Sequence, residues 1–295
     1  MGLDFITKSI SNNSTTSFDF GQPISAFCVG VSGFYFEYSD ERHNVQNMSL
    51  ALSANKVNSN TISVGLTEIL NDDSNNHITS GAWAYVTVFA WLGSGTPAAA
   101  IMANSKGVPS GGTSAPIATG GQYIYNHNAF CSGFNYAVQD GDEKIISIGY
   151  SCGASVSSDG SNITTNGDAN MVGDLQSINS LDIGLIAAIQ SSPGFEVQTV
   201  QGSASDTTLT TTFPTTVRKA CAVIQNFYAS YGTDNNLWEF KVGAMSHDAS
   251  THTNSYSVTV SGNEVTLANQ VYMVDNHSDH VATDTSVSYV VVALV

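Results

Sequence analysis

Apolar and polar residues alternate with a period of two over several segments of the chain, which is the pattern of β-strands that bury one face. In residues 61–66 the apolar positions are Ile62, Val64 and Leu66. Residues 289–295, by contrast, are almost continuously apolar and rich in valine, as expected of a strand buried on both faces. Because so apolar a strand would aggregate at an open edge, we expect it to be paired within a sheet or covered by an interface.

Clusters of Asn, Asp, Ser and Gly separate these segments, and such residues favour turns. Residues 71–76 and 275–279 are two examples. Residues 97–104 are the one segment that fits a short helix, and a strand fits it equally well. The pattern as a whole predicts an all-β protein built from short strands and polar turns.

The sequence also contains an internal repeat, which bears directly on the architecture. Residues 20–28 match residues 213–221, since both segments begin with Phe and end with Cys. Further matches between the first and last copies are Phe34 with Phe227, Tyr35 with Tyr228, Tyr38 with Tyr231, Asp72 with Asp275, His77 with His280, and Val88 with Val291. A more divergent copy lies between them, in which Gly133 and Phe134 match Gly33 and Phe34.

The repeat predicts three tandem β-sandwich modules of jelly-roll type. We place them at residues 1–92, 93–192 and 193–295, and the second module is the degenerate one. The segment 93–122, rich in Gly, Ser, Pro and Ala, contains the first junction.

The composition narrows the classes of partner. Charged residues make up only 11% of the chain and hydrophobic residues 42%, which indicates a globular protein rather than a disordered acidic chain. The formal net charge is −16, and no cluster of Lys or Arg offsets it. Such a chain repels phosphate groups, so we expect neither nucleic acid nor an anionic membrane surface as a partner. No stretch approaches the ~20 apolar residues of a membrane span, and residues 1–13 lack the pattern of a signal peptide, so we expect no membrane insertion.

One short motif resembles a catalytic motif but lies in the wrong structural context. Residues 149–153, Gly-Tyr-Ser-Cys-Gly, fit the G-x-S-x-G motif of serine hydrolases. That motif requires a turn between a strand and a helix, whereas the repeat aligns Ser151 with Ala51 inside a strand. No other catalytic or cofactor-binding motif is present, so we predict a protein that is not an enzyme and needs no cofactor.

Acidic and histidine side chains gather at equivalent turns of the first and third modules. They are Asp72, Asp73 and His77, and then Asp275, His277, Asp279 and His280. Oxygen-rich turns can bind Ca²⁺, and His with Asp can bind Zn²⁺ or Ni²⁺, so these residues are the candidate ligand or cation site, with the metal left open. The same groups can hydrogen-bond sugar hydroxyls, or can form a hydrated acidic turn with no ligand.

Aromatic residues follow the opening strand of each module. Because side chains alternate across a strand, we expect most of them to pack in the core or between modules rather than to form a sugar-binding surface. These residues are Phe34, Tyr35, Phe36, Tyr38, Tyr136, Phe227, Tyr228 and Tyr231. The tryptophans, Trp83, Trp91 and Trp238, do not occupy equivalent positions and therefore define no repeated site.

The cysteines predict a reducing site of synthesis. Cys28, Cys131 and Cys221 occupy similar places in the three copies, so none has a partner within its own module. Cys152 falls at a core position. We therefore expect four buried free thiols rather than disulfides.

The order of segments resembles that of known β-sandwich modules. An opening strand ending in Cys28 or Cys221, the segment 33–35, an alternating middle hairpin and a valine-rich closing strand are similar to modules of phage virion and tail-fibre proteins and of H-type lectins. H-type lectins form trimers, so the resemblance implies a single-chain pseudo-trimer. No sugar-binding motif of that family is readable here, so no site residue is carried over.

The function expected on these grounds is a structural or adhesive subunit of an extracellular assembly, such as a phage virion appendage, tail fibre or capsid decoration protein. Such a protein is made in a reducing cytosol and leaves the cell without a classical signal peptide. Its partners would be copies of itself or other structural subunits, and surface glycans. The alternative is a lectin that binds carbohydrate at the turns around Asp72 and His77 and around Asp275 and His280.

Overall fold

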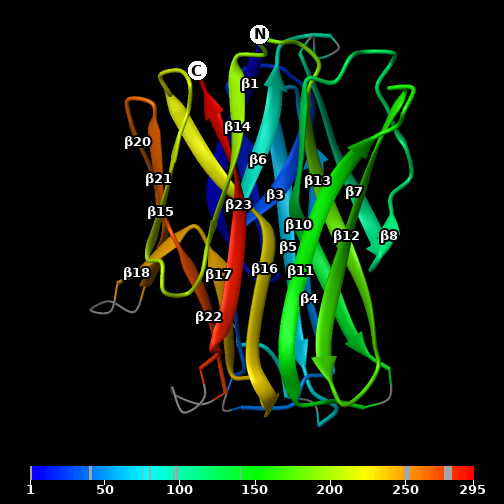
Figure 1. The fold of residues 1–295 in the computed structure, drawn as a ribbon, viewed down its shortest axis with the longest axis vertical. Helices are drawn as coiled ribbons and strands as arrows, with labels where there is room; N and C mark the ends of the chain where they lie inside the picture. Colours follow the sequence, from blue (N-terminus) through cyan, green and yellow to red (C-terminus); the bar gives the residue numbers. More distant parts are fainter. Residues whose placement is uncertain are drawn as a thin grey trace.

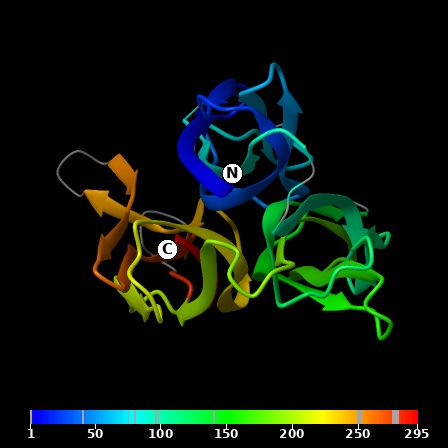
Figure 2. The same cartoon turned by 90° about the horizontal axis from the view of Figure 1, so that it is seen from above.

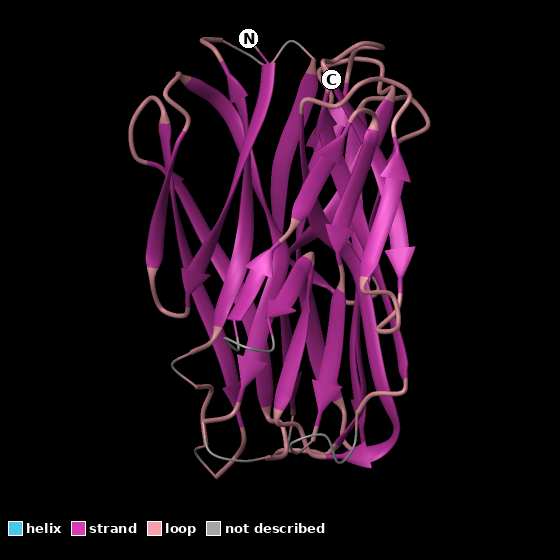
Figure 3. Cartoon of the chain, turned by 90° about the vertical axis from the view of Figure 1, so that its left-hand side faces the viewer, coloured by secondary structure: helices cyan, strands magenta, loops and turns pink. Residues whose placement is uncertain are grey.

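The computed structural model describes residues 2–39, 42–74, 76–79, 81–95, 97, 99–139, 141–248, 253–275 and 281–295. None of these residues lies in a helix, and the paired strands are antiparallel (Figure 3). The predicted all-β class is therefore confirmed. In the described part of the chain there is also no helix that is long and apolar enough to cross a membrane.

The strands follow one another along the chain with short connections. They are β1 (Gly2–Ser11), β2 (Thr15–Asp19), β3 (Ile24–Glu37), β4 (Asn47–Lys56), β5 (Thr61–Asn71), β6 (Trp83–Leu92), β7 (Ala100–Pro109), β8 (Gly112–Thr113), β9 (Ile117–Ala118), β10 (Asn126–Val138), β11 (Ile145–Val156), β12 (Asn162–Gly173), β13 (Ser177–Ala188), β14 (Phe195–Gly202), β15 (Thr208–Thr212), β16 (Lys219–Asn235), β17 (Glu239–Gly243), β18 (Met245–Asp248), β19 (Thr253–Tyr256), β20 (Val258–Ser261), β21 (Glu264–Ala268), β22 (Gln270–Val274) and β23 (Asp284–Leu294).

Seen from above, the ribbon forms three groups of strands around a common centre (Figure 2). The first group, coloured blue, contains β1 to β6; the second, green, contains β7 to β13; the third, yellow to red, contains β14 to β23. The strands run lengthwise, and both chain ends lie at the same end of the molecule (Figure 1).

The hydrogen-bonded sheets do not stop at the borders of these groups. The five-stranded sheet has the order β1-β6-β3-β17-β22, the six-stranded sheet β2-β5-β4-β10-β13-β7, and the seven-stranded sheet β14-β23-β16-β11-β12-β8. Each sheet therefore joins two groups, through the pairings β3–β17, β4–β10 and β11–β16. We call these three pairings seams. The sequence repeat did not predict them.

Equivalent residues of the repeat meet at the centre of the molecule. Phe34, Phe134 and Phe227 are buried, and their ring centroids lie 5.4, 5.5 and 5.7 Å apart in three edge-to-face contacts. We call them the phenylalanine triad. Edge-to-face pairs of this kind each add about 0.5–1.5 kcal/mol beyond the burial of their surface. The triad therefore packs all three groups onto one shared core.

Most other predictions about the interior are confirmed. Among the aromatic residues singled out from the sequence, those that join the triad in the core are Phe36, Tyr38, Tyr136 and Tyr231. All four cysteines are buried and free. The apolar closing strand β23 pairs with β14 on one side and β16 on the other, so it has no open edge. The segment that fitted either a helix or a strand enters β7 at Ala100.

The hydrolase-like motif is explained by its place in a sheet. Residues 149–153 lie within β11, between β12 and β16. Ser151 pairs with Asp168 on one side and Asn226 on the other. Its backbone is therefore extended, and it does not adopt the strand-to-helix turn that the motif requires.

Candidate functional site

The acidic turn of the first group is held by its own hydrogen bonds. Asp72 is buried, and its Oδ1 accepts hydrogen bonds of 2.9 Å from the backbone N–H groups of Ser74 and Asn76. Its Oδ2 accepts a 2.7 Å bond from the Asn76 side chain and lies 3.2 Å from His43 Nδ1. Burial alone would raise the pKa of Asp72, but these hydrogen bonds and the nearby His43 together lower it.

The other predicted ligands do not converge on Asp72. Asp73 is exposed, and its backbone N–H lies 3.4 Å from Asp142 Oδ2. His77 is exposed, and its backbone pairs with that of Asn71. No group of three or more His, Cys, Asp or Glu side chains in the described chain is arranged to hold a metal ion.

The equivalent turn of the third group is described only in part. Asp275 is buried, and its Oδ2 lies 3.5 Å from Arg42 Nη1, in a contact that connects the third group to the first. His277, Asp279 and His280 lie outside the described residues. Asp72 and Asp275, which the repeat makes equivalent, are thus both buried acids, each beside a basic side chain.

A groove of about 700 Å³ lies over the β3–β17 seam, on the outer face of the five-stranded sheet. Half-buried aromatic rings, carboxylates, amides and one lysine line it, and we call it the aromatic groove. The described residues along it are Ser9, Tyr35, Glu37, Gly81, Trp83, Tyr85, Trp238, Glu239, Lys241, Asn254, Gln270 and Tyr272.

The alternation of side chains along the strands builds this groove. In β3, Phe34 and Phe36 face the core, so Tyr35 and Glu37 face outward. The strand register then aligns one outward-facing row across four strands: Trp83 in β6, Tyr35 in β3, Lys241 in β17 and Tyr272 in β22. The row joins residues that are far apart in the sequence, and it crosses from the first group to the third.

The aromatic rings of the groove are held in fixed relative positions. Tyr35 and Trp83 are stacked, with centroids 5.9 Å apart and planes inclined by 20°. Trp83 contacts Tyr85 edge-to-face at 4.8 Å. The Tyr85 hydroxyl donates a 2.7 Å hydrogen bond to the backbone carbonyl of Asn254. Because each of these three rings contacts a neighbour, the groove presents pre-organised aromatic faces, which lowers the entropy lost on binding.

Two carboxylates stand opposite each other in the groove. Glu37 and Glu239 are direct cross-strand partners in the β3–β17 pairing. Glu239 Oε1 lies 2.7 Å from Lys241 Nζ, and Glu37 Oε2 accepts a 2.7 Å hydrogen bond from the Tyr35 hydroxyl. Burial, the bond to Glu37 and the charge of Glu239 raise the pKa of Tyr35, so this phenol stays a donor.

The aromatic row occurs at only one of the three seams. The corresponding row at the β11–β16 seam is Ser286, Tyr228, Gly149 and Asn170. At the β4–β10 seam the corresponding row is Ser180, Asn135, Ser49 and Ile69. One seam thus has three aromatic rings and a lysine where the others have one ring or none.

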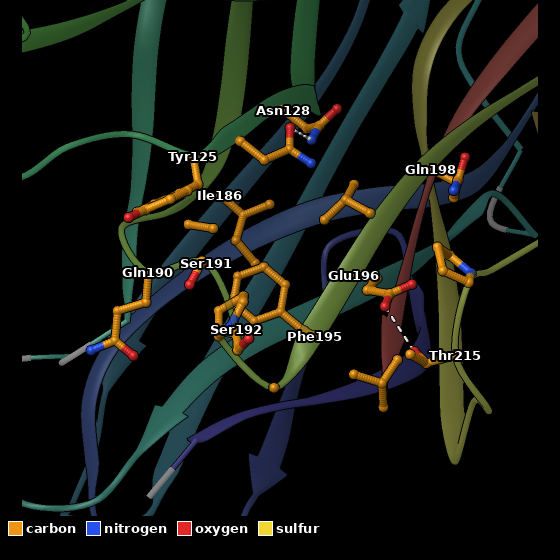
Figure 4. Close-up of a pocket in the computed structure, with 17 residues that line it drawn as sticks. Tyr125, Asn128, Ile186, Gln190, Ser191, Ser192, Phe195, Glu196, Gln198 and Thr215 are labelled. Atoms are coloured by element: carbon orange, nitrogen blue, oxygen red, sulfur yellow. Dashed lines mark hydrogen bonds between the residues drawn. The ribbon is translucent and has the colours of Figure 1, made fainter.

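A second cleft has a volume of about 600 Å³ (Figure 4). Because Val295 lines it, it lies at the end of the molecule that holds both chain ends (Figure 1). We call it the end cleft. Segment 190–194, which connects the second group to the third, forms one side, and Ile186 and Phe195 contribute its apolar surface. Glu196 is the one charged side chain among its described lining residues, and it accepts a 2.7 Å bond from the Thr215 hydroxyl. The end cleft has fewer aromatic and ionic groups than the aromatic groove.

Two tryptophans are the sequence signal for the aromatic groove, and the internal repeat does not reveal it. Trp83 and Trp238 both line it, whereas Trp91 is buried. Because they are not equivalent in the repeat, they define no repeated site, but a single site at one seam needs no equivalence. Tyr35 likewise matched Tyr228, although only Tyr35 lies beside a tryptophan.

Comparison of the sequence with models of known protein families found no match, and a search of curated proteins found none either. The function proposed below is therefore inferred from the fold and the two clefts.

Proposed function

We propose that this protein is a non-enzymatic adhesive subunit that binds carbohydrate in the aromatic groove. The row formed by Trp83, Tyr35, Lys241 and Tyr272 carries the proposal. A sugar ring offers apolar C–H faces and a rim of hydroxyl groups. Half-buried, fixed aromatic rings complement the C–H faces, and carboxylates and amides complement the hydroxyl groups.

This proposal moves the carbohydrate site away from the acidic turns. The oxygens of Asp72 already accept hydrogen bonds from within their own turn, so they offer little to a sugar hydroxyl. In the aromatic groove, by contrast, Gln270 adds a side-chain amide whose Oε1 has no hydrogen-bond partner within the described chain. An amide group both donates and accepts, as hydroxyl recognition requires.

We further propose that the chain is built from three tandem β-sandwich modules, at residues 1–92, 93–192 and 193–295. We propose that the protein belongs to an extracellular assembly, and more specifically that it is a phage virion appendage or decoration protein. The four buried thiols and the shared core of the three groups support it. Neither feature depends on a disulfide or an oxidising compartment.

The test is binding to a glycan array by the full chain, compared with two variants. Trp83→Ala removes one of the stacked rings, and we expect it to weaken binding to any recognised glycan by tenfold or more, because truncating a central aromatic residue of a binding site costs about 2 kcal/mol or more. Tyr123→Ala removes a 72% exposed ring that lines neither cleft and should leave binding unchanged.

Other outcomes would place the binding site elsewhere or contradict the proposed function. If Trp83→Ala binds normally and Tyr125→Ala does not, the end cleft is the binding site instead. If no glycan is bound, with or without Ca²⁺, the proposed function is wrong. The bound glycan should be recovered intact, and release of a shortened sugar would contradict the non-enzymatic role.

A further inference from the structure

The charges in the aromatic groove are unbalanced, and this imbalance bears on the kind of sugar it accepts. Among the described residues that line it, Glu37 and Glu239 are acidic and Lys241 is the only basic one. Like charges directly opposite each other on paired strands are unfavourable, so the pair needs compensation. Lys241 compensates Glu239 at 2.7 Å, whereas within the described chain the Glu37 carboxylate receives only the neutral Tyr35 hydroxyl.

The groove already holds one ammonium group in a well-defined way. Lys241 Nζ lies 4.6 Å from the centroid of the Tyr272 ring as well as beside Glu239. A carboxylate next to an aromatic face is a favourable environment for a cation, because the ring quadrupole and the negative charge act together. One strand further along, Glu37 lies at the hydroxyl end of Tyr35, which stacks on Trp83, so a carboxylate and aromatic rings are again close together.

We propose that the aromatic groove is selective for an amino sugar with a free, protonated amine. The amine would pair with Glu37 while the sugar ring lies against Trp83 and Tyr35. This inference rests on the proposed carbohydrate binding and adds the chemical class of the sugar. Acidic sugars are disfavoured by the uncompensated Glu37 and by the net charge of −16 on the chain.

The experiment is titration calorimetry of the full chain with four probes of similar size. They are a β-1,4-linked glucosamine trisaccharide, its fully N-acetylated counterpart, a galacturonic acid trisaccharide and the peptide trilysine. At about pH 6, where an amine of this kind is protonated, we expect the glucosamine trisaccharide to bind at least tenfold more tightly than its acetylated counterpart. The acidic trisaccharide should not bind.

Variants assign the selectivity to Glu37. Glu37→Gln keeps the shape of the side chain and removes its charge. The affinities for the amino trisaccharide and its acetylated counterpart should then lie within about threefold of each other. Glu196→Gln in the end cleft is the matched control and should keep the selectivity. Should Glu37→Gln unfold, the charge dependence of the selectivity can still be measured on the unchanged protein, where added salt should weaken binding of the amino trisaccharide and leave that of the acetylated one unchanged.

Three results would overturn the inference. Equal affinity for the amino and acetylated trisaccharides leaves the proposed function intact but removes the selectivity. Trilysine binding as tightly as the amino trisaccharide would show attraction to an acidic protein rather than recognition of a sugar. If no sugar binds, and Trp83→Ala changes nothing on the array, the proposed function fails together with the inference.

Discussion

Two acidic residues four positions apart show how local surroundings decide the behaviour of a carboxyl group. Asp72 has its oxygens bonded within a turn, and its pKa is lowered. Glu68 is buried in β5, between the inward-facing Leu66 and Leu70, and neither of its side-chain oxygens has a hydrogen-bond partner within the described chain. Burial raises the pKa of Glu68 well above its usual value, so the folded protein keeps this group protonated to a higher pH than the unfolded chain does.

Glu68 should make the protein less stable as the pH rises. Below the unfolded-state pKa of about 4.3 both states are protonated and Glu68 has no effect on stability that depends on pH. Above it the unfolded state releases a proton that the folded state retains, so the free energy of unfolding falls by about 1.4 kcal/mol per pH unit until the folded-state pKa is reached. Glu68→Gln should remove this slope, as measured by urea unfolding between about pH 4 and about pH 8.

The control for this prediction is Glu264→Gln, which changes an exposed carboxyl of β21 and should keep the slope of the unchanged protein. Parallel pH profiles for the unchanged protein and Glu68→Gln would show that Glu68 titrates normally in the folded state.

At the scale of strands, the seams are the distinctive feature. Gly33 and Gly243 are direct partners at the β3–β17 seam, and a Cβ at Gly243 would collide with the Cα atom of Gly33. Such close approach of two strands accounts for glycine at both positions. Since each seam consists of backbone hydrogen bonds, no group can unfold without opening two sheets that other groups share.

The shared sheets predict one cooperative unfolding transition. Three modules connected only by linkers would unfold independently, whereas strands paired across the seams couple the groups. Differential scanning calorimetry should show a single peak whose calorimetric and van't Hoff enthalpies agree. Phe34→Ala should lower its midpoint, because a buried Phe→Ala change costs about 3–5 kcal/mol. Two or three resolved peaks would mean that the groups fold separately despite the seams.

At the scale of the whole molecule, three groups surround one axis but differ in their surfaces. One seam carries the aromatic groove, whereas the outer face of the β4–β10 sheet exposes Ile69 and Ile178. In the proposed role, these different surfaces would make different contacts, with carbohydrate on one side and neighbouring subunits on another.

An adhesive subunit should be found assembled in its native source. We expect light scattering and electron microscopy of native material to show particles, fibres or ordered oligomers, because the exposed apolar positions would then be covered. Native material that contained only a soluble monomer would argue against the assembly role and leave carbohydrate binding to be judged alone.

The sequence predicted the elements and the core better than the connections between them. Alternation located the strands, and matching Phe34 with Phe134 and Phe227 identified the residues that meet at the centre. A repeat shows which positions are equivalent, but not which are in contact, so the seams were not predictable from it. The aromatic groove depends on the register that sets Tyr35 between Trp83 and Lys241, and only the paired strands reveal this.

The phenylalanine triad has a consequence for how such a molecule can change over time. In an assembly of three identical chains every substitution appears three times, so a new side chain must suit all three copies at once. Here the three equivalents belong to one polypeptide, and each can be altered separately. The centre can keep Phe34, Phe134 and Phe227 alike while the outer faces of the three groups diverge, as the aromatic row at one seam shows. A single chain can therefore carry three different surfaces, whereas a symmetric oligomer of one gene product repeats the same surface.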